Sequence, residues 1–324
     1  MTIEKRIVVV GVPRSGTTLV QSLLAAHEQV ASWTESHFFD RHFSDLRRMP
    51  RPLARLVGGS LLIHDPTPQV RAFLAENDEN EDAALPFLGA RWRPPLRLAS
   101  LRPLLTHRVA RALIELLDAL AAQRQRPVWL EKTPAHLRHL DLIERVTRDA
   151  ELHIVHVVRR GLDVVASLHR ASAHWERHYG VDECVARWNR GLTLTLERLE
   201  RARVSTDDGV DDRLVRDRLI QDHVVLYERL TADPEPEIAR LVDALGLPDR
   251  PDLVARRTSA SQRVVARDEQ AWKGDVERAI RPSSTVDDVL TATERRRAEA
   301  GLRHELYEKV CGLLEAAEES DIGI

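Results

Sequence analysis

The loop GVPRSGTT at residues 11–18 carries the clearest chemical signal in this 324-residue sequence. It follows a short β-branched run at 6–10 and precedes an amphipathic helix expected over 17–28. The backbone N–H groups that open such a helix point at the loop, and the helix dipole attracts negative charge to the same place. The pattern therefore predicts an anion-binding loop between a buried strand and a helix.

This loop differs from a triphosphate-binding loop at one decisive position. Gly11 and Gly16 have the spacing of the Walker A pattern GxxxxGK[ST], but Thr17 stands where that pattern has lysine. We also find no convincing apolar run ending in an aspartate that could hold magnesium. Arg14 offers a different cation inside the loop. We expect a nucleotide with a 5′-phosphate group and no γ-phosphate, and a P-loop kinase or other phosphotransferase is the alternative.

A second strand, basic turn and helix occur in VVRRGLDVVASLHR at 157–170. Arg159 stands at the end of the strand, and Ser167 lies two turns into the helix. An arginine fork suits a phosphate, and a hydroxyl at this offset can face the same side. The segment predicts a second anion site. AWKGDV, at 271–276, places the lysine Lys273 beside the indole of Trp272, which could stack on a base.

Two further segments could supply a proton acceptor and a cation at a reaction centre. TESHFFD, at 34–40, surrounds Glu35 with aromatic residues, and apolar walls make a carboxylate a better proton acceptor. EKTPAHL, at 131–137, follows the apolar run PVWL, so that Lys132 would point into a crevice. A preorganised cation there would stabilise negative charge that develops during a transfer reaction.

PRSGTT after a hydrophobic strand resembles the 5′-phosphosulfate loop of sulfotransferases that use 3′-phosphoadenosine 5′-phosphosulfate (PAPS). The similarity spans about 1–40 and 127–275. It implies PAPS as the donor, with no metal. It also implies a cofactor site made by the phosphate loop, the second anion unit and the late basic loop: Arg14, Ser15, Gly16, Thr17, Thr18, Arg159, Ser167 and Lys273.

The resemblance also assigns the reaction centre. ExHFFD is similar to the segment of Golgi glycan sulfotransferases that carries their glutamate base, and EKTPAHL is similar to their EKTPAYF segment. This implies Glu35 as the base, with Lys132 and Arg14 stabilising the transition state. In the cytosolic branch a histidine follows the lysine in a KTH arrangement, whereas His136 falls two positions too late. His136 is the second candidate for the base, and His37 is the third.

These segments need a fold that brings them to one edge. Apolar runs at 127–131, 151–158 and 223–228 alternate with helical patterns at 104–125, 137–148, 161–172 and 185–202. Such alternation favours an α/β fold with a parallel sheet flanked by helices on both faces, as in P-loop NTPase-like three-layer sandwiches. Binding sites in these folds lie beyond the carboxyl ends of the strands. HVVLYERL resembles the family's late strand and helix, in which we expect Tyr227 and Glu228 to brace the sheet.

Residues 40–103 break this rhythm with several prolines and the acidic stretch ENDENED at 76–82. We predict a partly helical insertion that covers the acceptor site within a single domain, 1–324. STDDGVDD at 205–212 is predicted to be an exposed loop.

Composition limits the partners. With 48 basic and 51 acidic residues, the net charge of -3 provides no general attraction for nucleic acid. No stretch approaches 18 uninterrupted apolar residues, so we expect no membrane insertion and a cytoplasmic protein. Cys184 and Cys311 lack the spacing of a metal site or a disulfide framework. We expect a small-molecule or glycan acceptor, and a homo-oligomer stays open.

Overall fold

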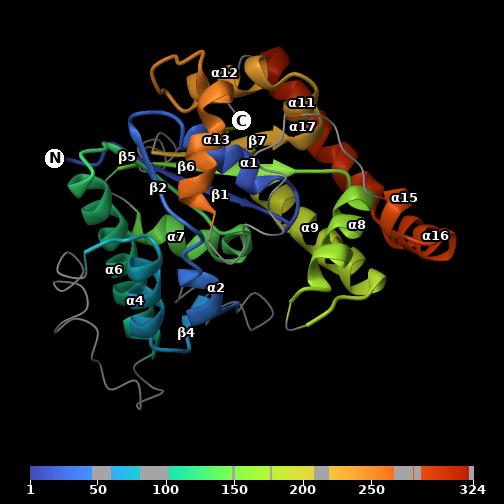
Figure 1. Ribbon diagram of the computed structural model, residues 1–324, viewed down its shortest axis with the longest axis horizontal. Coiled ribbons are helices and arrows are strands. Elements are labelled where there is room, and N and C mark those ends of the chain that lie inside the picture. The colour runs from blue at the N-terminus through green and yellow to red at the C-terminus, as the bar shows by residue number, and fades with distance from the viewer. Residues whose placement is uncertain are drawn as a thin grey trace.

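The computed structural model describes residues 1–45, 60–80, 102–147, 150–175, 177–207, 219–265, 280 and 286–320. Its centre is a parallel sheet with the strand order β2-β5-β1-β6-β7 (Figure 1). The strands of this sheet are β1 (Lys5–Gly11), β2 (Val30–Ser32), β5 (Val128–Lys132), β6 (Glu151–Val158) and β7 (Ile220–Leu226). The predicted parallel α/β sheet is confirmed.

The central strand β1 shows why its sequence is a continuous apolar run. Ile7 and Val9 belong to the core on one face of the sheet, and Val8 and Val10 belong to the core on the other. All four side chains are buried. A strand covered on both faces needs apolar residues at every position, because successive side chains point to opposite sides.

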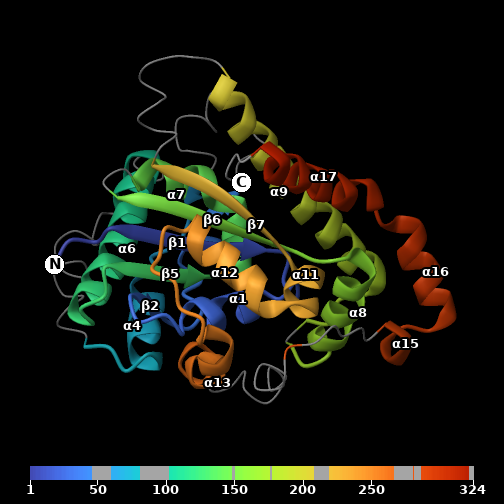
Figure 2. The ribbon, with the colours of Figure 1, turned by 90° about the horizontal axis from the view of Figure 1, so that it is seen from above.

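Helices cover both faces of the sheet, as Figures 1 and 2 show. One core contains residues of α1 (Thr17–Leu24), α12 (Pro234–Ala244) and α13 (Leu253–Val264). The opposite core contains residues of α6 (Arg102–Gln123) and α7 (Leu140–Val146). The predicted three-layer arrangement is therefore present.

A third core lies beyond the ends of β6 and β7, where Val158 and Leu226 pack against helices. It joins α8 (Gly161–Ser172) and α9 (Val181–Asp207) to the C-terminal helices, which are α15 (Val286–Val289), α16 (Ala292–Gly301) and α17 (His304–Ser320). Figure 2 shows these helices together at one end of the sheet.

Several predicted boundaries are wrong. The strand predicted at 223–228 begins at Ile220 and ends at Leu226, where its pairing with β6 also ends. Tyr227 instead opens α11 (Tyr227–Ala232). The helix predicted at 137–148 is a 3-10 helix, η2 (Pro134–His139), followed by α7. The loop predicted at 205–212 overlaps the end of α9 at Asp207. Local patterns miss these points because tertiary pairing decides where each element ends.

Part of the predicted insertion at 40–103 is described. It contains most of α2 (Phe38–His42), the antiparallel pair β3 (Phe43–Asp45) and β4 (Ser60–Leu62), and α4 (Thr67–Glu76). The rest, 46–59 and 81–101, lies outside the described residues.

Candidate active site

The candidate residues occupy one edge of the sheet. Arg14 follows β1, Glu35 follows β2, Lys132 ends β5, Arg159 follows β6 and Tyr227 follows β7. The carboxyl ends of parallel strands meet at the same edge, so the fold gathers five distant segments. The strands β5 and β6 lie on opposite sides of β1, which makes this the point where the chain changes direction across the sheet. Ligands of open α/β sheets bind at such switch points.

The phosphate loop is closed by its own backbone. The N–H of Ser15 donates to the carbonyl of Val12 at 3.1 Å, and Gly16 accepts from Leu19 at 3.0 Å to start α1. Gly16 is the N-cap residue of α1 and has a φ of 96°. As a glycine, it has no side chain that could cap the helix. Ser15 and Thr17 are buried, whereas Arg14 and Thr18 are partly exposed. The N-cap residue thus leaves the first amides of α1 uncapped, and uncapped amides at a helix N-terminus can bind an anion.

Gly16 is required by a close approach. A Cβ at this position would lie 2.3 Å from Cδ2 of Tyr227, which is far inside van der Waals contact. Its left-handed backbone would also strain any other residue. The ring of Tyr227 therefore packs directly on the phosphate loop, a contact that the sequence did not reveal.

The two predicted anion units meet at this edge. The Nε of Arg14 donates to the hydroxyl of Ser167 at 3.2 Å, and the guanidinium of Arg159 donates to the carbonyl of Arg14 at 3.3 Å. The guanidinium of Arg159 also lies 4.1 Å from the centroid of the Tyr227 ring. Arg14, Arg159 and Ser167 thus lie in one cluster. Arg14 is separated in the sequence from Ser167 by 153 residues and from Arg159 by 145. Lys273 and Trp272 lie outside the described residues.

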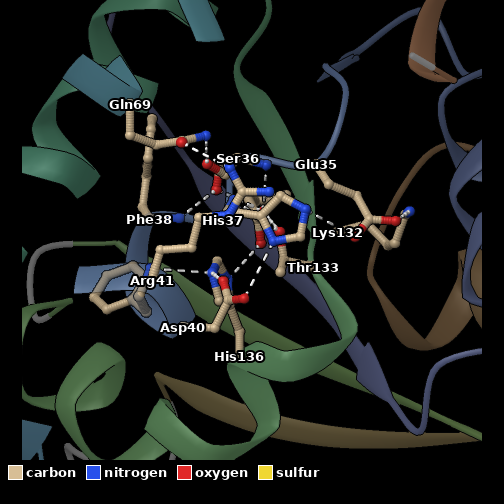
Figure 3. Close-up of polar contacts among 12 residues, drawn as sticks. Glu35, Ser36, His37, Phe38, Asp40, Arg41, Gln69, Lys132, Thr133 and His136 are labelled. Atoms are coloured by element: carbon tan, nitrogen blue, oxygen red, sulfur yellow. Dashed lines mark hydrogen bonds and ion pairs between the residues drawn. The ribbon is translucent and has the colours of Figure 1, made fainter. Parts of the chain in front are cut away.

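Glu35 and Lys132 form an ion pair, drawn in Figure 3, with Nζ 2.5 Å from Oε1. The side chain of Lys132 is fully buried, whereas that of Glu35 is 17% exposed. A buried ammonium needs such a partner because leaving water is costly for an isolated charge. The pair brings the predicted base and the predicted cation together.

His37 lies between the carboxylates of Glu35 and Asp40 (Figure 3). His37 places Nε2 3.6 Å from Oε2 of Glu35, and its Nδ1 lies 3.2 Å from Oδ2 of Asp40. Burial opposes the charge on Asp40, but hydrogen bonds from His136 and His37 outweigh it and hold the pKa of this carboxyl well below its usual range. Asp40 is therefore a fixed negative charge beside the imidazole of His37.

His136, the second candidate for the base, is enclosed by the fold. Its Nδ1 lies 2.9 Å from Glu131, and its Nε2 lies 3.2 Å from the amide nitrogen of Phe39 and 3.6 Å from Asp40. Burial opposes protonation, but the two carboxylates raise the pKa of His136 to about 9. Because the ring is buried and both of its nitrogens contact the protein, His136 is poorly placed to accept a proton from a substrate.

Glu131 fixes the turn that carries Glu35. One of its oxygens accepts from the hydroxyl of Ser36 at 2.8 Å and from that of Thr133 at 2.6 Å. Burial disfavours its charge, but His136 and these hydroxyls lower its pKa. The turn includes His37 in the left-handed region, at a φ of 53°. Sequence reasoning missed Glu131, although it stands beside Lys132 in the EKTP segment.

The α4 helix fastens the same turn from the other side. The side chain of Asn77 accepts from the amide of Thr34 at 3.0 Å and donates to its hydroxyl at 3.0 Å. Gln69 donates to the carbonyl of Ser36 at 3.0 Å. The predicted insertion therefore contacts the turn that carries Glu35.

A parallel sheet that gathers a glycine-containing loop, two arginines and an ion-paired carboxylate at the carboxyl ends of its strands is typical of enzymes that bind ligands at this edge. The sequence matches the sulfotransferase family over residues 6–252. The chain belongs to the sulfotransferase family and is an enzyme of that family.

Three solved structures are similar to this chain, and the first of them shows the same fold. The sulfotransferase domain of the Synechococcus PCC 7002 olefin synthase is 17% identical, with 92% of this chain and 94% of that chain covered and a TM-score of 0.50. The sulfotransferase domain from the curacin biosynthetic pathway is 15% identical, with coverages of 93% and 98% and a TM-score of 0.48. Sulfotransferase STF9 from Mycobacterium avium is 18% identical, with coverages of 93% and 76% and a TM-score of 0.46. The comparison with curated proteins finds no match.

Within the part of the chain that the structure describes, no helix is both long and apolar enough to cross a membrane.

Proposed function

We propose that this sulfotransferase moves the sulfuryl group of PAPS to a hydroxyl of a small-molecule or glycan acceptor, with an amine as the second type of acceptor. The observation that carries the proposal is the meeting of Arg14, Ser167 and Arg159 at the switch point, beside the Glu35–Lys132 pair. Two anion units suit a donor that carries both a 5′-phosphosulfate and a 3′-phosphate.

In this proposal the first amides of α1 and the side chains of Arg14, Thr17 and Thr18 hold the 5′-phosphosulfate. Helix N-termini bind such anions because their amides are unpaired and the dipole is favourable. Arg159 and Ser167 hold the 3′-phosphate. The contact of Arg14 with the hydroxyl of Ser167 and that of Arg159 with the carbonyl of Arg14 support this assignment, because they bring the two predicted anion units together. Lys273 remains a predicted third cation.

The acceptor oxygen attacks sulfur while the bond from sulfur to the bridging phosphate oxygen breaks. Negative charge then grows on the leaving phosphate, as it does in phosphoryl transfer. Lys132 and Arg14 are assigned to stabilise this charge, a contribution of roughly 10²-fold to 10³-fold by analogy with other anion-stabilising donors. The products are the sulfated acceptor, 3′-phosphoadenosine 5′-phosphate (PAP) and one proton.

Glu35 is assigned to accept that proton. Its carboxylate has one oxygen on Lys132 and the other facing His37 at 3.6 Å. Asp40 orients His37 through Nδ1, so that Nε2 faces Glu35. His37 thus supports the geometry of Glu35 in this scheme, and the enclosed His136 supports Asp40.

We also infer that residues 40–103 contribute to the acceptor pocket of a single domain. The contacts of Asn77 and Gln69 with the turn at 34–36 support this, because they set α4 next to the assigned base.

The test is a transfer assay with radiolabelled PAPS and a panel of sugars, phenols, alcohols and amines. We expect label to move to a hydroxyl compound without added metal and PAP to accumulate in equal amount. A parallel assay with γ-labelled ATP and magnesium serves as the control. Transfer from ATP, with none from PAPS to any compound, would replace this proposal by the kinase alternative.

A further inference from the structure

The turn that carries Arg159 is held from outside the sheet. The indole N–H of Trp188, in α9, donates to the carbonyl of Arg159 at 3.0 Å. The backbone N–H of Arg160 donates to Oε1 of Glu228, in α11, at 2.9 Å. Two helices thus hold the carbonyl and the N–H of the single peptide group that joins Arg159 to Arg160. Because the second contact involves a carboxylate, it is among the stronger hydrogen bonds.

The C-terminal helices reach the same turn. A Cβ on Gly161 would lie 2.7 Å from the side chain of Leu302 and 3.1 Å from that of Trp188. A larger residue at the start of α8 would have to displace the side chains of Leu302 and Trp188. Leu302 is itself buried between α16 and α17. The turn therefore packs against the connection between these two helices.

Tyr307, in α17, completes the arrangement through a hydrogen bond. Its hydroxyl donates to Oε2 of Glu228 at 2.9 Å, so that one carboxylate joins α17 to the amide of Arg160. Burial and the charge of Glu228 raise the pKa of Tyr307 far above its usual value. The hydroxyl therefore keeps its proton and remains a donor across the physiological range.

The connection between α16 and α17 is anchored on α9. The side-chain amide of Asn189 donates to the carbonyl of Gly301 at 2.9 Å and accepts from the N–H of Arg303 at 3.0 Å. These two bonds hold both sides of the connection at once. The helices α15, α16 and α17 all lie beyond residue 252, where the match to the sulfotransferase family ends.

We propose that Tyr307 is a positioning residue for recognition of the donor's 3′-phosphate, acting through Glu228 on the turn that presents Arg159. The proposal rests on the assignment of Arg159 to the 3′-phosphate made above. Glu228 follows Tyr227, whose ring lies against the guanidinium of Arg159 at 4.1 Å, so α11 fixes both the backbone and the side chain of this arginine. The C-terminal helices thereby contribute to donor specificity without touching the donor.

The test compares PAP with AMP, two nucleotides that differ only by the 3′-phosphate. Calorimetric titration of the full chain should show that Tyr307→Phe weakens PAP binding by about five- to tenfold, a loss typical of one hydrogen bond to a charged group at a distance from the ligand. AMP binding should not change. Tyr179→Phe is the matched control, because Tyr179 packs on the same core but contacts Arg187 and Trp175 rather than the turn.

A double variant tests whether Tyr307 acts through Glu228. In a Glu228→Ala background the additional change Tyr307→Phe should have no further effect on PAP binding, since the link is already broken. Equal weakening of PAP and AMP by Tyr307→Phe would mean general loosening and would overturn the inference, as would no change in either. If the unaltered protein binds PAP no more tightly than AMP, the assignment of Arg159 fails first, which separates the two claims.

Discussion

The proposed site has a donor side, with Arg14 and Arg159, and a proton side, with Glu35, Lys132 and His37. The two sides differ in the contacts that these residues make. On the donor side, Arg14 and Arg159 contact a hydroxyl, a carbonyl and an aromatic ring. On the proton side, Lys132 and His37 contact carboxylates. The contacts described on the donor side join the two arginines to each other and to α8 and α11, whereas those on the proton side pair cations with carboxylates.

This contrast follows from the chemistry that each side would perform. A donor with phosphate groups brings its own negative charges, and arginine guanidiniums can match them with charge-assisted hydrogen bonds. A proton acceptor must instead stay ionised and oriented when no ligand is bound, and neighbouring opposite charges accomplish both. Removing one partner of such a buried pair is costly, because the other charge is then uncompensated.

The largest expected effect separates chemistry from donor binding. Glu35→Gln should lower turnover by about 10²- to 10⁴-fold, because a general base is lost. PAP affinity should change little, since Glu35 belongs to the proton side. Steady-state kinetics and calorimetry measure the two quantities. Glu28→Gln, at an exposed carboxylate that pairs with Arg250, is the control and should retain full turnover. A full-rate Glu35→Gln enzyme would remove Glu35 from the mechanism.

A substitution of Arg159 should lower the affinity for the donor nucleotide. Arg159→Ala should weaken PAP binding by about 10- to 100-fold, as expected when a charge-assisted contact to phosphate is removed, while AMP binding is nearly retained. Arg160→Ala serves as the control, because its side chain is exposed and its structural contact is made by the backbone. Comparable losses for PAP and AMP would show that Arg159 does not distinguish the 3′-phosphate.

A smaller effect is expected from the loop backbone. Gly16→Ala would force a Cβ against Tyr227 and strain a left-handed residue, so we expect PAP and AMP affinities to fall together by about tenfold. Gly180→Ala is the control, since a Cβ there meets no atom within 4 Å. Unchanged affinity in Gly16→Ala would show that the contact between Tyr227 and the loop does not shape the donor site.

The last prediction concerns stability on the proton side. The pKa of His136 is raised from 6.5 to about 9 in the folded protein, so its stabilising contribution is complete below pH 6.5 and is lost as the pH rises through 9. Urea unfolding should show a loss of about 1–2 kcal/mol between pH 7 and pH 9 from this group. In His136→Gln this part of the slope should disappear, whereas His174→Gln, at an exposed histidine, should retain it. An identical slope in His136→Gln would contradict the charge pairing with Glu131 and Asp40.

Short-range patterns predicted the strands β1, β5 and β6 and several of the helices that flank the sheet. The apolar runs identified β1, β5 and β6, because a strand that is buried on both faces needs apolar residues at nearly every position. Residues that directly follow these strands must meet at one edge, so Arg14, Lys132 and Arg159 could be grouped before their contacts were known. Their individual roles stay predictions.

Local sequence patterns could not predict the contacts between distant segments. Glu131 with Ser36 and Tyr307 with Glu228 are separated by 95 and 79 residues, and nothing local signals either pair. Tyr227 was expected to brace the sheet, yet its ring also fills the space above Gly16. Such contacts depend on how helices pack, which sequence periodicity does not specify.

The most direct measurement of the central claim is the stabilisation of the full chain by nucleotides, followed by thermal unfolding. The account predicts that PAP at about a hundred times its dissociation constant adds roughly 2.7 kcal/mol to the free energy of unfolding. AMP at the same concentration should add clearly less, and ATP with magnesium should not exceed AMP. Stabilisation by ATP and magnesium with none by PAP would contradict the account.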